Sequence, residues 1–325
     1  MCHHDIAYKR CTRYNIADFC TETVIQPRGK ANVVRGSFRM SPTSKVGETY
    51  RPALQYRINL HLQIGIKRIP WTTENTDQAS QEAALTRELA VWCTLSTADS
   101  NVLELLGTVT FGDQQKYLPL SSVFHFYENG DLIKIKDATA GVKYIHNHKI
   151  VHGDLKQGNV LVDNEGCAKI CDFGSAYSLE ECHPCPVASP SDFRNLMTEI
   201  YLSPEVWDDD EAHTTYQSDI WALGCLLFEV SGSIQSRFDV ISFISPPSPH
   251  QVQTGRRVYN GTSDFQISCN MGMGHPPATA ESFSANEIIQ AVGRVALACL
   301  STEPHERPTA DQVYQQLSEI NDIAN

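Results

Sequence analysis

Hydrophobic residues recur at helical spacing in several segments of the chain. Leu85, Leu89 and Trp92 follow one another at intervals of four and three residues, and no Gly or Pro interrupts residues 78–95. This spacing places the three side chains on one face of a helix, so a helix is predicted there. Similar apolar stripes, and in one case an almost wholly apolar surface, predict further helices over residues 137–148, 218–230, 288–299 and 309–320.

Shorter apolar runs, rich in β-branched residues and bounded by turn residues, predict strands. Residues 24–36 and 60–67 form two such runs before the first helix. Residues 159–163 and 168–172 form two more around the turn at 164–166, which predicts a hairpin. Three segments without a period are expected to be irregular: a lead-in at 1–22, a mobile loop at 175–197, and a Pro-, Gly- and Ser-rich surface loop at about 231–282.

Composition narrows the class of protein. With 325 residues, of which 41% are hydrophobic and 20% charged, the chain has the composition of a soluble globular protein with one large domain or two small ones. A formal charge of −12 argues against nucleic-acid or anionic-membrane partners, since both attract clustered Lys and Arg. The longest apolar run, residues 220–228, is too short for a membrane span, and the N-terminus lacks signal-peptide features. A soluble, cytoplasmic protein is therefore expected.

Eleven cysteines are numerous for a chain of this kind. Cys182 and Cys185 have the Cys-x-x-Cys spacing of a zinc site, and Cys2, His3 and His4 add possible ligands. A structural zinc site normally shows a second well-spaced pair, which the sequence lacks. Free cysteines in a reducing compartment are the favoured interpretation.

The candidate chemistry lies in residues 150–174. Asp154, Lys156, Asn159 and Asp172 fall at the spacing His-x-Asp-x-Lys-x-x-Asn, followed by Asp-Phe-Gly. This pattern resembles the catalytic and metal loops of eukaryotic protein kinases. The resemblance implies that Asp154 accepts the hydroxyl proton of the substrate, that Lys156 neutralises the moving phosphoryl group, and that Asn159 and Asp172 hold Mg²⁺. The alternative is that both aspartates are ordinary loop residues that cap turns. Two motifs in the correct order, joined by an apolar hairpin, argue against it.

The same resemblance extends to the residues that would bind ATP. Lys67, at the end of a predicted strand, matches the lysine that grips the ATP phosphates, and Glu88 stands where the family places its ion-pair partner. The alternative is that both are solvated surface residues. Residues 101–107 and 118–127 resemble the next two strands, and Phe126 would face the adenine.

The glycine-rich phosphate loop of the family is poorly matched. Counting back from Val33, the three glycine positions hold Gln26, Arg28 and Ala31, and Gly29 lies one place out of register. Glycine lets backbone amides approach a phosphate without a Cβ in the way, so its absence threatens closure over ATP.

Three further residues match structural positions of the family. Glu205, in Ser-Pro-Glu, and Arg307, in a downstream Arg-Pro, would form a buried ion pair. Asp219 would brace the backbone of the catalytic loop (residues 152–159), although Ser218 or Asp219 could also cap a helix. Gly153 replaces the usual arginine of this loop, as in a subset of kinases of the tyrosine-kinase-like group, many of them fungal. Because that arginine ordinarily pairs with a phosphorylated activation segment, control by such a phosphate is not expected.

The chain also departs from the family between residues 128 and 148. The hinge-like segment 128–131 leads almost at once into residues that match only the end of a long helix. A dozen or more residues, on the order of 20 Å of helix, are missing. Either a gene model has skipped an exon or the domain is impaired.

Together these features predict an α+β, two-lobed protein kinase fold. A small antiparallel β-sheet lobe with one helix would occupy residues 23–127, and a larger, mainly helical lobe residues 128–325. By resemblance to the family, Lys156 two places after Asp154 implies transfer of the ATP γ-phosphate to Ser or Thr of a protein substrate. The main alternative is a pseudokinase that binds nucleotide or a partner and transfers nothing. An unrelated binding module would require every motif to be coincidental.

Overall fold

The computed structural model describes residues 13–14, 19–24, 32–38, 62–69, 78–95, 101–111, 120–127, 135–179, 201–208, 213–236 and 287–324. The chain forms two compact units. The first comprises Met1–Ala98 and Leu103–Tyr127, and the second comprises Asp99–Val102 and Glu128–Asn325. The division after Tyr127 falls where the sequence analysis ended the first lobe, but the assignment of Asp99–Val102 to the second unit was not foreseen.

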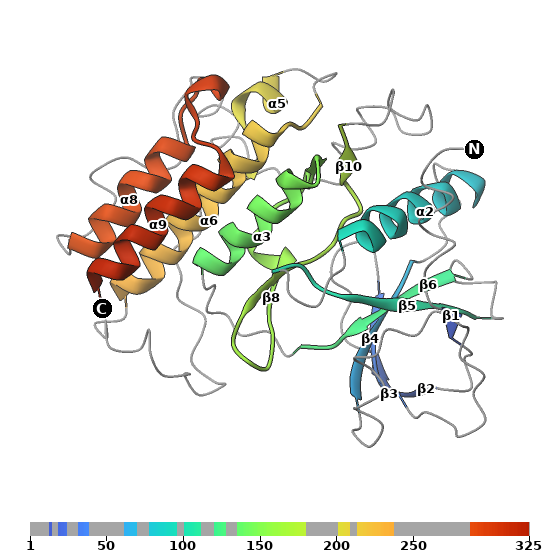
Figure 1. Cartoon of the computed structure of the whole chain (residues 1–325). Coiled ribbons are helices and arrows are strands. Elements are labelled where there is room, and N and C mark those ends of the chain that lie inside the picture. The colour runs from blue at the N-terminus through green and yellow to red at the C-terminus, as the bar shows by residue number, and fades with distance from the viewer. Residues whose placement is uncertain are drawn as a thin grey trace. The chain divides into compact units, whose positions relative to one another are not determined.

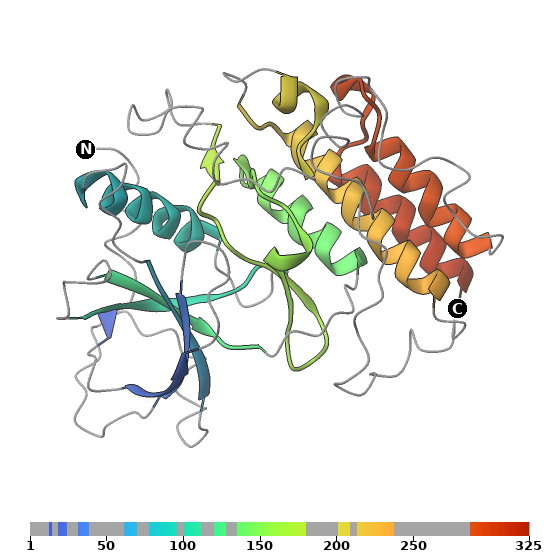
Figure 2. The same cartoon turned by 180° about the vertical axis from the view of Figure 1, so that it is seen from behind.

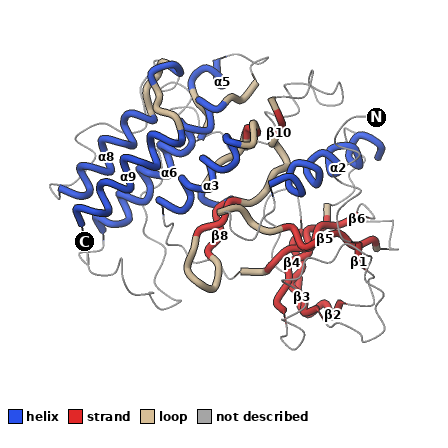
Figure 3. Tube along the Cα trace, viewed as in Figure 1, coloured by secondary structure: helices blue, strands red, loops and turns tan. Residues whose placement is uncertain are grey.

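The described part of the first unit is a six-stranded sheet with one helix (Figures 1 and 3). The strand order is β1-β5-β6-β4-β3-β2, and every pair is antiparallel except β1 with β5. The helix α2 covers Gln78–Leu95, which is the predicted range. The strands are β1 Arg13–Tyr14, β2 Phe19–Val24, β3 Asn32–Phe38, β4 Leu62–Arg68, β5 Leu105–Thr110 and β6 Leu120–His125.

Two of these strands correct the sequence analysis. β1 and most of β2 lie within residues 1–22, for which an irregular lead-in was predicted. The run Phe19–Val24 contains two threonines and a valine, which favour strand, but it lacks an apolar alternation that would reveal it. Its pairing with β3, a partner that follows it in the chain, supplies the backbone hydrogen bonds.

The sheet has a small apolar core, and within it Gly65 makes room for the ring of Phe124. Ile64, Ile66, Val109 and Val123 are buried together. Between the two isoleucines, Gly65 pairs in register with Phe124 on β6. A Cβ at Gly65 would lie 2.5 Å from the Phe124 ring, so the absence of a side chain makes room for that ring.

The described part of the second unit is mainly helical. α6 packs against α8 and α3, and α9 packs against α3 and α8, so these four helices lie side by side (Figures 1 and 2). Ile220 to Phe228 of α6 are all buried, as expected for a helix that is apolar all round. The helices are α3 Ile135–Asn147, α5 Pro204–Asp208, α6 Tyr216–Ser236, α8 Glu287–Cys299 and α9 Ala310–Ala324, with short 3₁₀ turns at Gln157–Asn159 (η3) and Pro304–Glu306 (η7). The strands are β7 Ile150–Val151, β8 Val160–Val162, β9 Ala168–Ile170 and β10 Tyr177–Ser178.

Asn101 explains why Asp99–Val102 belongs to the second unit. Its main-chain oxygen accepts a hydrogen bond from the amide of Ile170 at 2.8 Å, and its side-chain amide donates to the oxygen of Ala168 at 3.0 Å. On the other side, a Cβ at Gly141 of α3 would lie 2.6 Å from the Asn101 oxygen. The glycine therefore lets α3 approach this short segment closely.

The limits of several predicted elements require correction. The predicted hairpin is confirmed as β8 and β9, although Asn159 lies in η3 before it. α6 begins at Tyr216 and is capped by Thr215, whose Oγ1 accepts from the amide of Ser218 at 3.2 Å while Ser218 Oγ accepts from the amide of Thr215 at 2.7 Å. Neither Ser218 nor Asp219 is thus the cap residue. α6 also continues to Ser236, into the predicted surface loop.

The remaining predictions on chain organisation lie largely outside the described residues. These are the phosphate loop with Gly29, the segment at 128–131, most of the predicted mobile loop, and the pair Cys182 and Cys185. Among the described helices, none is both long and apolar enough to cross a membrane.

Candidate active site

The backbone of the catalytic loop is held by Asp219 of α6. Its Oδ2 accepts from the amide of His152 at 2.8 Å and its Oδ1 from the amide of Gly153 at 2.9 Å. The imidazole Nε2 of His146, on α3, lies 2.9 Å from the same Oδ2. These hydrogen bonds are the geometry that the predicted bracing role of Asp219 requires. His146 was not foreseen, because nothing in its local sequence relates α3 to α6.

Asp154, Lys156 and Asn159 meet in one cluster. Lys156 Nζ donates to Asp154 Oδ2 at 2.6 Å, and Asn159 Nδ2 donates to the main-chain oxygen of Asp154 at 2.8 Å and to its Oδ2 at 3.2 Å. Burial raises the pKa of Asp154 above its ordinary value of 3.8, and the hydrogen bond from Lys156 opposes that rise. The site thus holds a carboxylate whose basicity exceeds that of a surface aspartate, beside a cation.

The hairpin β8–β9 brings Asp172 to the end where Asn159 lies. Val160 pairs with Ile170, and the amide of Cys171 donates to the Asn159 oxygen at 2.9 Å. Asp172 then adopts a left-handed backbone conformation, with φ of 66°, which is uncommon for a residue other than glycine. Such strain concentrates at functional positions.

The residues at this end of the hairpin suit a Mg²⁺ ion. Mg²⁺ prefers oxygen ligands and is usually held by one or two protein groups together with water and substrate phosphates. The Asp172 carboxylate supplies such oxygens. Because Asn159 uses its Nδ2 as a donor toward Asp154, its amide oxygen is the atom that would face a cation. The described residues contain no group of three or more His, Cys, Asp or Glu side chains arranged for a metal, so a site for an all-protein cage is not seen among them.

In the first unit, Lys67 and Glu88 form the predicted ion pair. Lys67 Nζ lies 2.7 Å from Glu88 Oε1, and only 15% of the lysine and 5% of the glutamate side chain are exposed. Both residues lie on regular elements, β4 and α2, so the pair has a fixed place. The interpretation of the two as solvated surface residues is wrong.

The other residues expected to contact ATP are only partly described. Val33 is half-buried on β3 and pairs in register with Lys67. Phe126 follows β6, where its amide donates to the oxygen of Gln63 at 3.1 Å and its ring lies 5.1 Å from the Arg35 guanidinium carbon. Their contacts with a nucleotide stay predictions, as does the role of Gly29.

The ion pair between Glu205 and Arg307 is also present. Both terminal nitrogens of Arg307 donate to the two carboxylate oxygens of Glu205 at 2.7 Å. Arg307 Nη1 and Nε donate further to the main-chain oxygens of Gln217 and Ser301 at 2.9 and 2.8 Å. The arginine side chain is fully buried, whereas 27% of the Glu205 side chain is exposed. The pair therefore links α5 to α6 and to the turn before α9.

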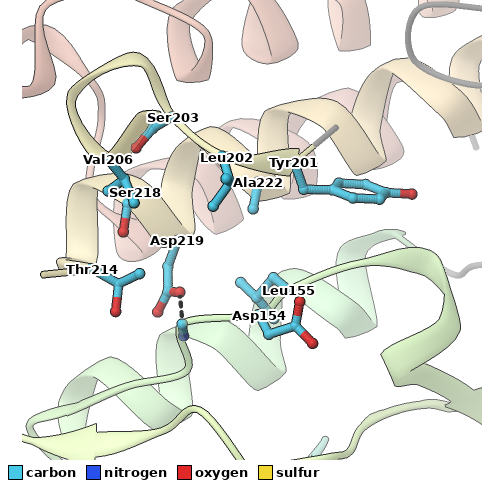
Figure 4. Close-up of a pocket in the computed structure, with 11 residues that line it drawn as sticks. Asp154, Leu155, Tyr201, Leu202, Ser203, Val206, Thr214, Ser218, Asp219 and Ala222 are labelled. Carbon is cyan, nitrogen blue, oxygen red and sulfur yellow. Dashed lines mark hydrogen bonds between the residues drawn. The ribbon is translucent and has the colours of Figure 1, made fainter. Parts of the chain in front are cut away.

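A small pocket lies beside Asp154, with a volume of about 20 Å³, the space of roughly one water molecule (Figure 4). Asp154 and Leu155 form one side, and Tyr201, Leu202 and Ser203 approach from the segment before α5. The hydroxyl of Tyr201 donates to Glu229 Oε2 of α6 at 2.8 Å. Burial and the Glu229 carboxylate both raise the pKa of Tyr201, so this hydroxyl stays protonated. Sequence reasoning singled out Ser203, in the Ser-Pro-Glu motif, but not Tyr201 and Leu202, because only folding brings them to Asp154.

Residues 63–317 match the family of the protein kinase domain, and this range covers most of the chain. The chain belongs to the protein kinase domain family. The predicted fold class, an α+β kinase fold with a small antiparallel sheet and a larger helical part, is confirmed by this match and by the two units described above. The idea of an unrelated binding module is wrong.

Three relatives of this kinase domain are named as protein kinases. The chain is 30% identical over 175 residues to mitogen-activated protein kinase kinase kinase 2 of Arabidopsis thaliana, covering 53% of this chain and 22% of that protein. It is 26% identical over 226 residues to mitogen-activated protein kinase kinase kinase ANP1 of the same plant, covering 66% and 29%. It is 26% identical over 214 residues to the serine/threonine-protein kinase BCK1/SLK1/SSP31 of Saccharomyces cerevisiae, covering 63% and 12%. The matched part therefore spans less than a third of each of these relatives.

Proposed function

We propose that this kinase domain transfers the γ-phosphate of ATP to a Ser or Thr hydroxyl of a protein substrate. The observation that supports this most directly is the cluster of Asp154, Lys156 and Asn159, with Asp172 at the adjoining end of the hairpin. The Lys67–Glu88 ion pair provides the second requirement of the reaction, a positioned ammonium for the phosphates.

The residues of the cluster have distinct roles. Asp154 orients the substrate hydroxyl and accepts its proton, and its raised pKa makes it a better base than an exposed aspartate. Lys156, 2.6 Å from Asp154, supplies positive charge where the transferred group carries negative charge. Asn159 and Asp172 would hold Mg²⁺, which when bound neutralises charge on the phosphates. Lys67 would bind the phosphates, and Glu88 keeps its ammonium in place.

The choice of Ser or Thr rests on Lys156 and on the relatives. A lysine two places after the aspartate is the serine/threonine pattern by family resemblance. Two of the relatives named above are mitogen-activated protein kinase kinase kinases, and the yeast relative is a serine/threonine-protein kinase. A protein substrate in a signalling cascade is therefore proposed.

We also propose a cytoplasmic location. Two buried cysteines, Cys225 of α6 and Cys299 of α8, carry free thiols, as is usual for proteins of a reducing compartment.

A pseudokinase remains the second candidate, and one observation favours it. In the sequence, the positions of the phosphate-loop glycines hold Gln26, Arg28 and Ala31, residue types whose Cβ hinders the approach of backbone amides to a phosphate. On this alternative the ion pairs described above preserve the fold and a binding surface, and the protein transfers nothing.

Phosphate transfer to a generic Ser/Thr peptide pool, followed by mass spectrometry, decides between the two candidates. Asp154→Asn should lower the rate by about 10²- to 10⁴-fold. Asp311→Asn is the matched control, because Asp311 lies on α9 and its carboxylate forms an exposed ion pair with Lys143, well apart from Asp154 in the chain. Activity in the wild type and the control, with loss in Asp154→Asn, supports the kinase. No transfer by a well-folded wild type, under conditions in which Mg²⁺ and ATP still raise its melting temperature, supports the pseudokinase.

A further inference from the structure

The five residues that follow Gly174 form backbone hydrogen bonds with residues 149–151, which lead into the catalytic loop. In β10, Tyr177 pairs with Val151 and Ser178 with Ile150 of β7. The amide of Leu179 then donates to the oxygen of Lys149 at 2.9 Å. Ser175–Leu179, called the β10 segment here, therefore runs antiparallel to the residues that lead into His152.

Gly153 leaves room for the β10 segment because it has no side chain. Its φ of 78° is a left-handed conformation that side chains disfavour. A Cβ at Gly153 would lie 2.9 Å from the main-chain oxygen of Ser175 and 3.1 Å from Thr214 Oγ1. The space in which the Cβ of a larger residue would stand is thus occupied by the β10 segment on one side and by Thr214 on the other.

The side chain of Tyr177 joins the β10 segment to Thr214. Its hydroxyl donates a hydrogen bond to the main-chain oxygen of Thr214. Burial raises the pKa of Tyr177, so the hydroxyl remains a donor at neutral pH. Thr214 is itself buried and immediately precedes Thr215, the residue that caps α6.

The contact at Thr214 lies close to the group that holds the catalytic loop. Asp219, in the first turns of α6, accepts from the amides of His152 and Gly153, and Figure 4 shows Thr214 and Asp219 on the same side of the pocket that Asp154 lines. Tyr177 therefore fixes the β10 segment to the part of the fold that also fixes the catalytic loop.

We infer that Tyr177 is a positioning residue: its hydrogen bond to Thr214, with the close fit around Gly153, holds the β10 segment on the catalytic loop without a phosphate group. The inference rests on the proposed kinase function for its effect on rate, but not for its effect on structure. In kinases with arginine before the catalytic aspartate, a phosphorylated activation segment supplies a comparable tie by pairing with that arginine. In this chain Gly153 stands at the position of that arginine, and the hydroxyl of Tyr177 ties the segment to Thr214 instead, so the enzyme should be active without phosphorylation.

Tyr177→Phe tests the inference, with Tyr314→Phe as the matched control. The control removes the same hydroxyl from α9, where the Tyr314 ring packs against the ammonium groups of Lys136 and Lys143. Each protein is treated with phosphatase until its intact mass shows no phosphate. Hydrogen–deuterium exchange of residues 149–152 and 175–179 is then measured, together with kcat and the KM for ATP.

Three results are expected. Dephosphorylated wild type keeps its activity, whereas Tyr177→Phe lowers kcat by about three- to tenfold with little change in KM, as the loss of one positioning hydrogen bond implies. Amide exchange speeds up in both segments of Tyr177→Phe and not in Tyr314→Phe. Unchanged exchange in Tyr177→Phe, or loss of wild-type activity on dephosphorylation, would overturn the inference. If the wild type transfers no phosphate under any condition, the proposed function fails, but the exchange measurement still decides whether Tyr177 holds the β10 segment.

Discussion

Arg307 grips Glu205 with both terminal nitrogens at 2.7 Å, although 102 residues separate the two in the chain. The arginine is fully buried and also donates to the main-chain oxygens of Gln217 and Ser301. A planar, five-donor guanidinium is suited to this set of acceptors, and a lysine ammonium is not. The pair therefore acts as a structural tie within the second unit rather than as part of the chemistry.

We expect Arg307→Ala to destabilise the protein by about 3–5 kcal/mol, because it leaves acceptors without a partner and opens a buried space. The value should lie toward the lower end, since Glu205 is 27% exposed and can be hydrated. Urea denaturation followed by circular dichroism measures the change. Arg307→Lys is the control for charge alone, and a lysine variant as stable as wild type would show that the bidentate geometry is unimportant.

Glu88→Gln should slow phosphate transfer while leaving the fold intact. The substitution replaces the carboxylate that accepts from Lys67 by a neutral amide oxygen, and a hydrogen bond between charged partners is worth on the order of 1.5–3 kcal/mol, so kcat/KM should fall by up to about 10- to 150-fold. Glu82→Gln, at an exposed position of the same helix, should change it little. Steady-state kinetics with varied ATP would refute the expectation if the two variants behaved alike.

The raised pKa of Asp154 predicts a pH dependence of stability. A carboxyl group that holds its proton more tightly in the folded state binds more protons there, so stability falls as pH rises from 3.8 through the raised value. At pH values above the raised pKa, Asp154 is ionised in the folded protein, and the burial of its charge lowers the free energy of unfolding. Asp154→Asn carries no such charge and avoids this loss. We therefore expect the variant to melt at a higher temperature than wild type at pH 7, with the gap narrowing as the pH approaches 4. A gap that is constant across this range would show that Lys156 already compensates the burial of the charge.

Gly65→Ala should destabilise the first unit through its contact with Phe124. The new Cβ would lie 2.5 Å from a ring that is 7% exposed and packs at 5.7 Å from Trp92, so the ring cannot move freely. Overpacking of this kind costs roughly 1–3 kcal/mol. The double variant Gly65→Ala/Phe124→Leu, compared with Phe124→Leu alone, should show a smaller cost for the added methyl group. Equal costs in both backgrounds, measured by urea denaturation, would rule out the proposed contact.

Those parts of the fold that depend on local patterns could be predicted from the sequence. The range of α2 follows from its uninterrupted apolar spacing, and the hairpin β8–β9 from two β-branched runs around a turn. The ion pairs of Lys67 and Arg307 were predictable only because their motifs resemble those of a known family. No local pattern marks contacts between distant segments, which is why His146, Tyr177 and Thr214 were missed. Each is an ordinary residue whose role depends on which main-chain oxygen or carboxylate the fold brings to it.

Because Asn101 belongs to the second unit, that unit is discontinuous in the chain, and this limits where the protein can be truncated. A fragment that began at Glu128 would contain α3 and β9 but not the residue whose oxygen and side-chain amide bond to Ile170 and Ala168. It would leave a buried amide and a buried carbonyl unsatisfied, at a cost of about 1–3 kcal/mol each, and an open space beside Gly141. The helical unit thus depends on Asn101, a residue that precedes β5 and β6 in the chain, whereas the rest of the unit follows them. The two units cannot be separated by a single cut without losing these contacts, whereas a fragment that joins Asp99–Val102 to Glu128–Asn325 would keep them.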